Sequence, residues 1–231
     1  MFDGKFRKPV DAAVKPVGRA LERNRWLTPD HLTVVGLLVG VGAAVAIGAG
    51  NLRLGLVLVI LAALPDLLDG ALAKASGAAS QRGAFFDSTV DRVTDSFLLG
   101  GIAWYFATDD QFSGQLAMLP FAIAAVSSLI SYQRAKAESL GLDAKGGIME
   151  RAERIIAICI GLLFEVLLIP ILWIMLALTI VTAVQRFVKI WRQAAVAPVT
   201  QERIEMRRSR RQSRRVARIE RRRTRIPRRN G

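Results

Sequence analysis

Residues 66–91 read DLLDGALAKASGAASQRGAFFDSTVD and place four aspartates, Asp66, Asp69, Asp87 and Asp91, inside two long apolar segments. An ionised carboxylate at membrane depth costs about 3 kcal/mol or more, so such residues mark functional sites. The first two aspartates are three residues apart and the last two are four apart, so each pair shares one helix face. The linker between the pairs is short, and two antiparallel helices joined by it would turn both pairs toward one cavity.

The side chains of this cavity indicate its chemistry. Carboxylates without His or Cys nearby suit hard cations that prefer oxygen ligands, so we expect Mg²⁺, with Mn²⁺ as a substitute. Two such ions about 4 Å apart would clamp a phosphate ester for an in-line displacement. Gly70 and Gly83 would let a bulky substrate approach the backbone. Asp95 continues the face of Asp87 and Asp91 by one turn, and we expect it to support the site rather than to form it.

The remaining sequence predicts an all-α integral membrane protein. Hydrophobic residues make up 52% of the 231 residues, and the mean hydropathy is +0.32. A membrane-spanning helix needs about 20 apolar residues. The sequence offers six such segments, at 32–49, 53–74, 84–107, 115–138, 152–169 and 171–195. Short turns are predicted after the first, third and fifth of them, at Gly50-Asn51, at Asp109-Asp110-Gln111 and at Ile169-Pro170.

Three regions follow from this pattern. Residues 1–27 mix basic and apolar side chains at helical spacing, which predicts an amphipathic juxtamembrane helix on the membrane surface. Residues 28–196 hold the six spans. Residues 197–231 form an Arg-rich tail, and the 14 Arg and 3 Glu of residues 201–231 account for +11 of the net charge of +14. The tail favours anionic lipid head groups as its partner. It has no aromatic residue for base stacking, so nucleic acid is not an expected partner.

The loops predict the orientation of the chain. Basic residues gather after the second, fourth and sixth segments, whereas the other connections are short. By the positive-inside rule, both termini and the aspartate cavity therefore face the cytoplasm.

The aspartate run resembles a known signature. It reads Asp66-x-x-Asp69-Gly70-x-x-Ala73-Lys74 and, eight residues later, Gly83-x-x-x-Asp87-x-x-x-Asp91, which is similar to the signature of the CDP-alcohol phosphatidyltransferases. One position departs from it: Lys74 stands where that family has Arg, which keeps the charge and loses the bidentate fork. The resemblance implies a six-helix protein of the bacterial cell membrane, a homodimer, with its polar cavity open to the cytoplasm.

The resemblance also implies roles for single residues. Asp66, Asp69 and Asp87 would bind one Mg²⁺ ion, and Asp87 and Asp91 a second. Asp91 would also be the general base that deprotonates the acceptor alcohol. The alkoxide would then attack the β-phosphorus of CDP-diacylglycerol, and CMP would leave. The residues implied to bind the CDP-lipid are Pro29, Asp30, His31, Leu32, Thr33, Gly70, Lys74 and Ser80.

A second set of residues bears on the acceptor alcohol. Arg186 lies deep in an apolar segment and needs an anion, from a side chain or from a ligand. With Arg134, Arg151 and Arg154 it would build a cationic pocket for a phosphate, although ion pairs with neighbouring glutamates (Glu138, Glu150 and Glu153) account for some of these arginines. The segments around these residues resemble actinobacterial phosphatidylinositol-phosphate synthases. That resemblance assigns Ser131, Arg134, Arg154 and Arg186 to inositol 1-phosphate, so the product would be phosphatidylinositol phosphate.

Three other interpretations remain at this point. Glycerol 3-phosphate also carries a phosphate, so a phosphatidylglycerophosphate synthase would need the same cations. An ion transporter would share the intramembrane carboxylates, but it would not need glycines at these offsets, and its aspartates should lie at mid-depth. A membrane-anchored adaptor acting through its tail leaves the four aspartates unexplained.

Overall fold

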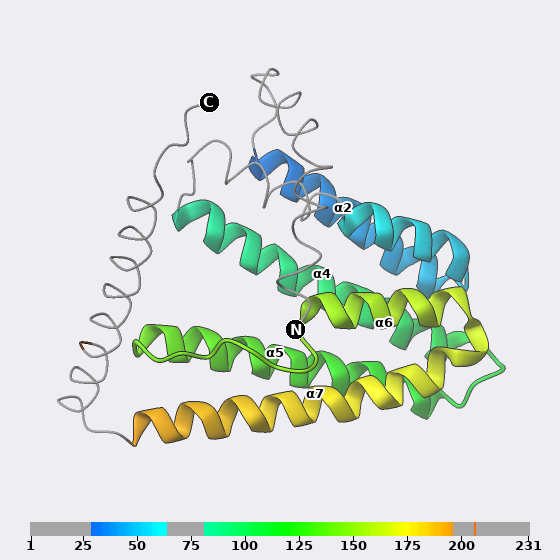
Figure 1. The fold of residues 1–231 in the computed structure, drawn as a ribbon. Helices are drawn as coiled ribbons and strands as arrows, with labels where there is room; N and C mark the ends of the chain where they lie inside the picture. The colour runs from blue at the N-terminus through cyan, green and yellow to red at the C-terminus, as the bar shows by residue number, and fades with distance from the viewer. Residues whose placement is uncertain (1–28, 64–80, 196–205, 207–231) are drawn as a thin grey trace, which may run out of the picture.

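The computed structural model of the chain describes residues 29–63, 81–195 and 206, and every regular element in that part is a helix (Figure 1). The elements are α2 (Pro29–Gly48), a helix at Leu52–Ala63, α4 (Gln81–Thr108), the short 3₁₀ helix η1 (Gly114–Ala117), α5 (Met118–Ser139), α6 (Arg151–Leu163) and α7 (Glu165–Ala194). They follow the order of the six predicted segments. The predicted helix at 1–27, the aspartates Asp66 and Asp69, and nearly all of the tail lie outside the described residues.

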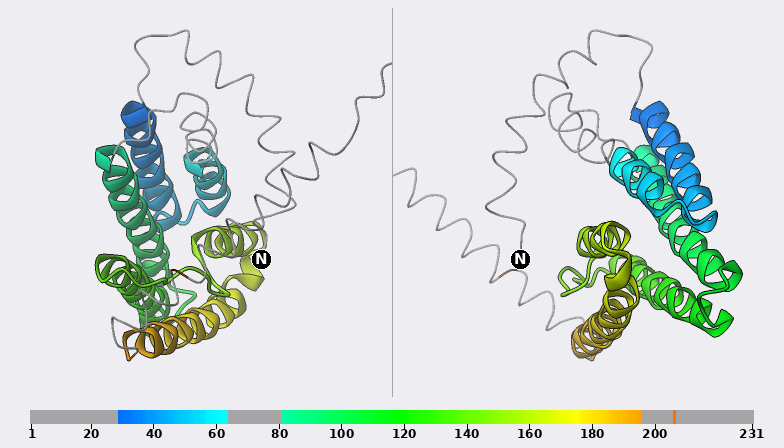
Figure 2. Two further views of the ribbon diagram at one scale, coloured as in Figure 1. Left: turned by 60° about the vertical axis from the view of Figure 1, so that its left-hand side comes forward. Right: turned by 90° about the vertical axis from the view of Figure 1, so that its right-hand side faces the viewer.

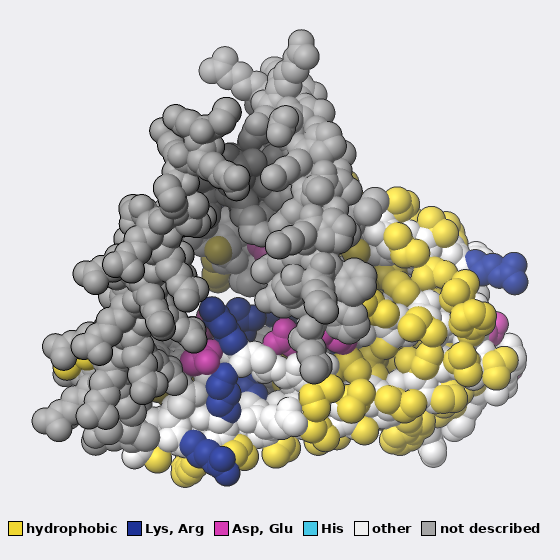
Figure 3. Space-filling model, in the orientation of Figure 1, with side chains coloured by type: hydrophobic (Ala, Val, Ile, Leu, Met, Phe, Trp, Pro, Cys, Tyr) yellow, Lys and Arg dark blue, Asp and Glu magenta, His cyan; other side chains and the backbone are white. Residues whose placement is uncertain are grey.

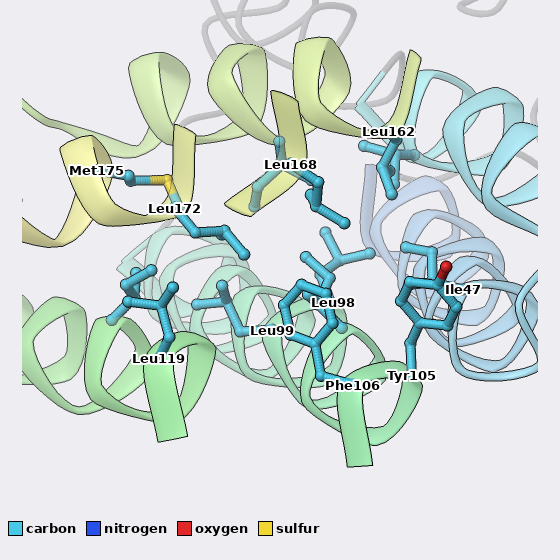
Figure 4. Close-up of a cluster of buried hydrophobic side chains, with 14 of the residues drawn as sticks. Ile47, Leu98, Leu99, Tyr105, Phe106, Leu119, Leu162, Leu168, Leu172 and Met175 are labelled. Carbon is cyan, nitrogen blue, oxygen red and sulfur yellow. The ribbon is translucent and has the colours of Figure 1, made fainter. Parts of the chain in front are cut away.

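Helix α4 is central to the packing. It contacts α2 on one side and α5 and η1 on the other. In two further views, α2, the 52–63 helix and α4 lie together, and α5, α6 and α7 form a second group (Figure 2). The buried core joins both groups: Leu98, Leu99 and Phe106 of α4 lie close to Leu168 and Leu172 of α7 (Figure 4).

Small residues set the distance between α2 and α4. A Cβ atom built on Gly101 would lie 2.9 Å from the Cα atom of Ala44, which is closer than side chains tolerate. One built on Gly40 would lie 2.7 Å from Cγ2 of Thr94. Because residues early in α2 face residues early in α4, and late ones face late ones, the two helices run parallel and begin at the same end of the bundle.

The turn between the last two helices differs from the prediction. The predicted turn at Ile169-Pro170 is wrong, because the break lies at Phe164 (φ −118°, ψ 87°) and Pro170 is inside α7. The two helices approach closely beside this break, where a Cβ added to Gly161 would lie 2.8 Å from Cδ1 of Leu168. Pro170 is the sixth residue of α7, just beyond the four N–H groups at the helix start that have no partner within the helix. The turns predicted after α2 and α4 are confirmed, with Gly50 at φ +80°.

Three of the described helical stretches are long and apolar enough to cross a membrane: His31–Gly48, Gly114–Ser139 and Glu165–Ala194. The 52–63 helix is apolar but shorter in its described part. Large apolar side chains are exposed on the outer faces of these helices, such as Val45, Phe121 and Trp173. The chain is therefore a helical membrane protein, and the full set of six spans stays a prediction.

Candidate active site

Helix α4 carries three carboxylates one turn apart, Asp87, Asp91 and Asp95. Residues four apart share a helix face, so all three point to the same side. Asp87 and Asp91 are partly exposed, whereas Asp95 is 8% exposed. Along this face, the carboxylates therefore change from accessible at Asp87, near the start of the helix, to buried at Asp95, two turns later.

Two arginines of α6 bind this acidic face. The guanidinium of Arg151 lies 2.8 Å from Oδ1 of Asp91 through Nη1 and 3.2 Å from Oδ1 of Asp95 through Nε. Arg154 is 4% exposed and donates from Nη2 to Oδ2 of Asp95 at 2.7 Å. Asp95 thus accepts hydrogen bonds from both arginines, and removal of one partner of such a buried pair is strongly destabilising. These contacts agree with the support role predicted for Asp95, which stays a prediction.

Arg186 of α7 is also buried, at 4% exposure, and it stands between α5 and the loop before α6. Its Nη1 donates to the carbonyl of Ile130 at 3.1 Å, and Nη2 donates to the carbonyl of Gly146 at 3.2 Å and to Oε1 of Glu150 at 3.4 Å. Among the described residues, nothing accepts a hydrogen bond from its Nε, which is buried. Buried polar groups normally have partners, so an open donor on a buried guanidinium favours a bound anion or water here.

The other two predicted acceptor residues lie on the last turns of α5. Ser131 is partly buried and donates from Oγ to the carbonyl of Ser127 at 3.0 Å. Arg134 is exposed and forms an ion pair with Glu138 one turn later, with 2.9 Å between Nε and Oε1. The predicted ion pairs with Glu138 and Glu150 are therefore present, for Arg134 and Arg186.

The pairs with the α4 carboxylates were not expected from the sequence. Sequence reasoning looked for partners of Arg151 and Arg154 among nearby glutamates, and the structure gives them Asp91 and Asp95 instead. The signal that could have found them is the extension of the acidic face to Asp95, since a buried carboxylate needs a cation or hydrogen-bond donors as partners.

Two of the predicted metal ligands lie on the accessible part of the acidic face. Asp87 and Asp91 supply hard oxygen ligands one turn apart, as Mg²⁺ and Mn²⁺ require. In the part of the chain that the structure describes, no three His, Cys, Asp or Glu side chains gather closely enough to hold an ion. The other predicted ligands, Asp66 and Asp69, lie outside that part, as do Gly70, Lys74 and Ser80.

The predicted nucleotide-binding segment begins α2. Pro29 is the first residue of that helix. His31 is exposed, Leu32 is half-buried and Thr33 is buried. Because α2 and α4 begin at the same end of the bundle (Figure 1), this segment and Asp87 lie at one end of the molecule.

Charged side chains gather at this end. In Figure 3 the Lys, Arg, Asp and Glu side chains of the described part lie mainly in its left half, whereas hydrophobic side chains cover the right half. We call this side of the described part the charged end; in Figure 1 it holds the start of α4 and the ends of α5 and α7, and α6 begins nearer the middle of the molecule. Charged side chains beside an apolar surface suit a reaction between a lipid and a polar partner.

Comparisons with known proteins agree with this picture. A family model described as CDP-alcohol phosphatidyltransferase matches residues 26–195. The phosphatidylinositol phosphate synthase of Corynebacterium glutamicum is 35% identical over 203 residues, which cover 85% of this chain and 90% of that protein.

Solved structures give the same result. The crystal structure of the Mycobacterium tuberculosis phosphatidylinositol phosphate synthase with CDP-DAG bound is similar with a TM-score of 0.72 at 32% identity, and it covers 78% of this chain and 94% of its own. The structure of the same enzyme in complex with manganese and citrate has a TM-score of 0.71 at 31% identity, with coverage of 77% and 88%.

Proposed function

The chain belongs to the CDP-alcohol phosphatidyltransferase family, and from this premise we propose that it is an enzyme that transfers the phosphatidyl group of CDP-diacylglycerol to inositol 1-phosphate. The products are phosphatidylinositol phosphate and CMP. The observation that carries the acceptor is Arg186, a buried guanidinium at the charged end with one donor left for an anion. A phosphorylated acceptor would supply an anion to this donor, whereas an uncharged alcohol would not.

The reaction replaces one phosphoester bond by another. The acceptor hydroxyl gives its proton to the Asp91 carboxylate while its oxygen bonds to the β-phosphorus of CDP-diacylglycerol. The bond from that phosphorus to the bridging oxygen breaks, and CMP leaves with the electron pair. Arg151 holds Oδ1 of Asp91 at 2.8 Å and so fixes the orientation of the carboxylate that acts as base.

We assign two divalent ions, Mg²⁺ or Mn²⁺, to the aspartates. Asp66, Asp69 and Asp87 would hold one ion, and Asp87 and Asp91 the other. When bound, the ions supply positive charge to the phosphates of the CDP-lipid and to the leaving group. The manganese complex of the Mycobacterium tuberculosis enzyme supports the use of such an ion.

The two substrates take opposite sides of the acidic face in this proposal. The start of α2 (residues 29–33), with Gly70, Lys74 and Ser80, binds the CDP-lipid; the relative with CDP-DAG bound supports this substrate. Arg154 and Arg186, with Ser131 and Arg134, bind the phosphate of the acceptor. The ion pair of Arg134 with Glu138 is exposed, and such pairs contribute only about 0.5 kcal/mol, so a phosphate can displace the glutamate.

We also propose how the enzyme is placed in the cell. Six spans within residues 28–196 would cross the bacterial cell membrane, with both termini and the charged end in the cytoplasm. There the water-soluble acceptor and CMP can enter and leave. The chain would act as a homodimer, and chemical cross-linking in membranes tests this.

The deciding experiment is CMP release by the purified protein with CDP-diacylglycerol and Mg²⁺. Inositol 1-phosphate, glycerol 3-phosphate, free inositol and serine are offered separately. Turnover with inositol 1-phosphate alone is the expected result. Turnover with glycerol 3-phosphate instead would overturn the acceptor and keep the transferase chemistry. Absence of turnover with all four would direct the next experiment to Lys74→Arg.

A further inference from the structure

One face of α7 carries four polar side chains at helical spacing: Thr182, Arg186, Lys189 and Gln193. The intervals of four, three and four residues put them in one row along the helix. All four contact the loop of residues 142–150, which leads from α5 into α6, and we call this loop the strap. The row begins beside α6 and ends near the end of α7, so the strap follows α7 along its last three turns.

The far end of the strap is held at Asp143. The side-chain amide of Gln193 pairs with the backbone of Asp143 in both directions: Nε2 donates to the carbonyl at 2.7 Å, and the Asp143 N–H donates to Oε1 at 3.0 Å. Lys189 lies 3.1 Å from Oδ2 of Asp143 and donates to the carbonyl of Lys145 at 2.6 Å. The charged and amide groups together fix a short backbone segment that has no helix or strand of its own.

The charge of Asp143 is present at neutral pH. The N–H of Lys145 and the ammonium group of Lys189 both favour the carboxylate, so the pKa of Asp143 lies below its ordinary value. A carboxyl group whose pKa is lowered on folding contributes stability above its unfolded value of about 3.9, and this contribution is lost as the pH falls through the folded pKa. The ion pair between Asp143 and Lys189 is therefore lost only in strong acid.

The near end of the strap is packed as well as hydrogen-bonded. The N–H of Met149 donates to Oγ1 of Thr182 at 3.0 Å. Next to it, a Cβ atom on Gly147 would lie 2.6 Å from Cγ2 of Thr182, so the backbone passes α7 at a distance that only glycine allows. Ala144 and Met149 are buried, at 2% and 7% exposure. This degree of fixation is unusual for a connecting loop, because loops commonly lie on the surface and tolerate change.

The strap ends where the arginines begin. Glu150 is the N-cap of α6, and Arg151 and Arg154 lie in the first turn of that helix. Through Asp91 and Asp95 these two arginines connect α6 to the acidic face of α4. The position of the first turn of α6 thus depends on α4 on one side and on the strap on the other.

We propose that Lys189 and Gln193 are positioning residues for acceptor binding. They hold the strap so that Arg154 and Arg186 stand at the right separation for the phosphate of the acceptor. Neither residue touches the substrate in this proposal, which rests on the proposed function. A displacement of about 1 Å in a binding group can cost up to a hundredfold in rate, so a distant hold can matter for catalysis.

The test compares Lys189→Ala/Gln193→Ala with the wild-type protein and with Arg192→Ala. Arg192 is an exposed cation on the same turn of α7, and it is outside the row that holds the strap. The double variant should raise the KM for the phosphorylated acceptor about tenfold, while the KM for CDP-diacylglycerol changes by less than about twofold. Arg192→Ala should change neither, and Lys189→Arg alone, which keeps the ion pair, should keep the wild-type acceptor KM.

A second readout does not need turnover. Hydrogen exchange measured by mass spectrometry should become faster in peptides from residues 142–150 and in the peptide that contains Arg154, in the double variant only. Faster exchange in the strap with unchanged exchange around Arg154 and unchanged acceptor KM would overturn the proposal. A parallel rise of both KM values would also overturn it, because that pattern indicates general damage.

The two proposals fail in different ways. If the wild-type protein uses glycerol 3-phosphate, the acceptor assignment fails and the strap is tested with that substrate. If the wild-type protein turns over no acceptor, the exchange around Arg154 decides the matter. Unchanged exchange there then refutes the positioning role.

Discussion

Asp95 is the residue on which the contacts between α4 and α6 converge. Its two carboxylate oxygens accept from Arg151 and from Arg154, and its side chain is 9% exposed. The pair with Arg154 is shielded from water on both sides, so neither charge can be solvated if the other is removed. Asp91, one turn earlier, shares Arg151 but remains accessible.

Replacement of Asp95 should therefore destabilise the protein. Asp95→Ala should lower the free energy of unfolding by about 3 kcal/mol, because it leaves the Arg154 guanidinium buried without its anion. Thermal unfolding in detergent measures the effect. Glu138→Ala, which breaks the exposed pair with Arg134, is the matched control and should cost less than about 1 kcal/mol. Equal losses in the two variants would contradict the prediction.

Asp91 should show the opposite profile, with loss of activity and little loss of stability. Asp91→Asn should lower the rate of CMP release at least about a thousandfold, since the amide cannot accept the proton of the acceptor hydroxyl. Folding and CDP-diacylglycerol binding should be retained. Asp110→Asn, at an exposed position of the α4–η1 connection, is the control. Retained turnover in Asp91→Asn would remove its role as base.

Substitution of Arg186 should affect the KM of one substrate and not that of the other. Arg186→Ala should raise the acceptor KM at least about tenfold and leave the KM for CDP-diacylglycerol nearly unchanged, because hydrogen bonds to charged groups contribute about 1.5–3 kcal/mol. Steady-state kinetics with each substrate varied in turn measures both values. Two unchanged KM values would show that the phosphate binds elsewhere.

At the scale of the elements, glycines decide how closely α2 and α4 approach. Gly101 faces the backbone of Ala44, whereas a Cβ on its neighbour Gly100 would meet open space. The two glycines are adjacent in one helix, so a comparison of alanine variants at the two positions separates the effect of packing from that of helix propensity.

The variants Gly101→Ala and Gly100→Ala should therefore change the stability of the protein in different directions. Gly101→Ala should destabilise the protein by about 1–3 kcal/mol, because α2 must move away from α4. Gly100→Ala should be neutral or stabilising by up to about 1 kcal/mol, since alanine is the better helix former. Thermal unfolding of both variants in the same detergent checks this. Equal behaviour would show that the helices do not pack at this distance.

The elements also show what the sequence could and could not predict. Apolar runs predicted the helices and their order, because a long apolar segment in lipid must be helical. The turn at Phe164 was missed because proline at Pro170 is an ambiguous signal: it ends a helix or lies near the start of the next one. The strap was also missed, since its contacts join residues about 40 to 50 positions apart, and no local pattern shows such pairs.

At the scale of the whole molecule, the charged end gathers residues from both groups of helices. The first group supplies Asp87, Asp91 and Asp95, and the second supplies Arg151, Arg154 and Arg186. Of the predicted acceptor residues, Arg154 contacts Asp95, and Arg186 contacts Gly146 and Glu150 of the strap. The extension of the acidic face to Asp95 indicates that a cation is needed there, but that Arg151 and Arg154 supply it depends on the packing of α6 across the bundle.

Removal of divalent cations should stop the reaction without unfolding the protein. The helices described here are held by packing and by ion pairs between side chains, so chelation by EDTA should abolish CMP release and leave the unfolding temperature within a few degrees. Mg²⁺ or Mn²⁺ should restore the activity, since both accept oxygen ligands. Full activity in EDTA would contradict the metal assignment.

The pair of Asp95 and Arg154 joins residues 59 positions apart in the chain, and this separation has a consequence for biosynthesis. In the proposed six-span arrangement α4 crosses the membrane, and the ribosome completes it before it makes α6, so the carboxylate is present before its guanidinium partner has been synthesised. Until then the nascent helix carries a charge that lipid does not solvate. Release of α4 from the insertion machinery should therefore wait for α6. Shortening the chain to end before residue 151 should leave α4 as the segment that is inserted least efficiently.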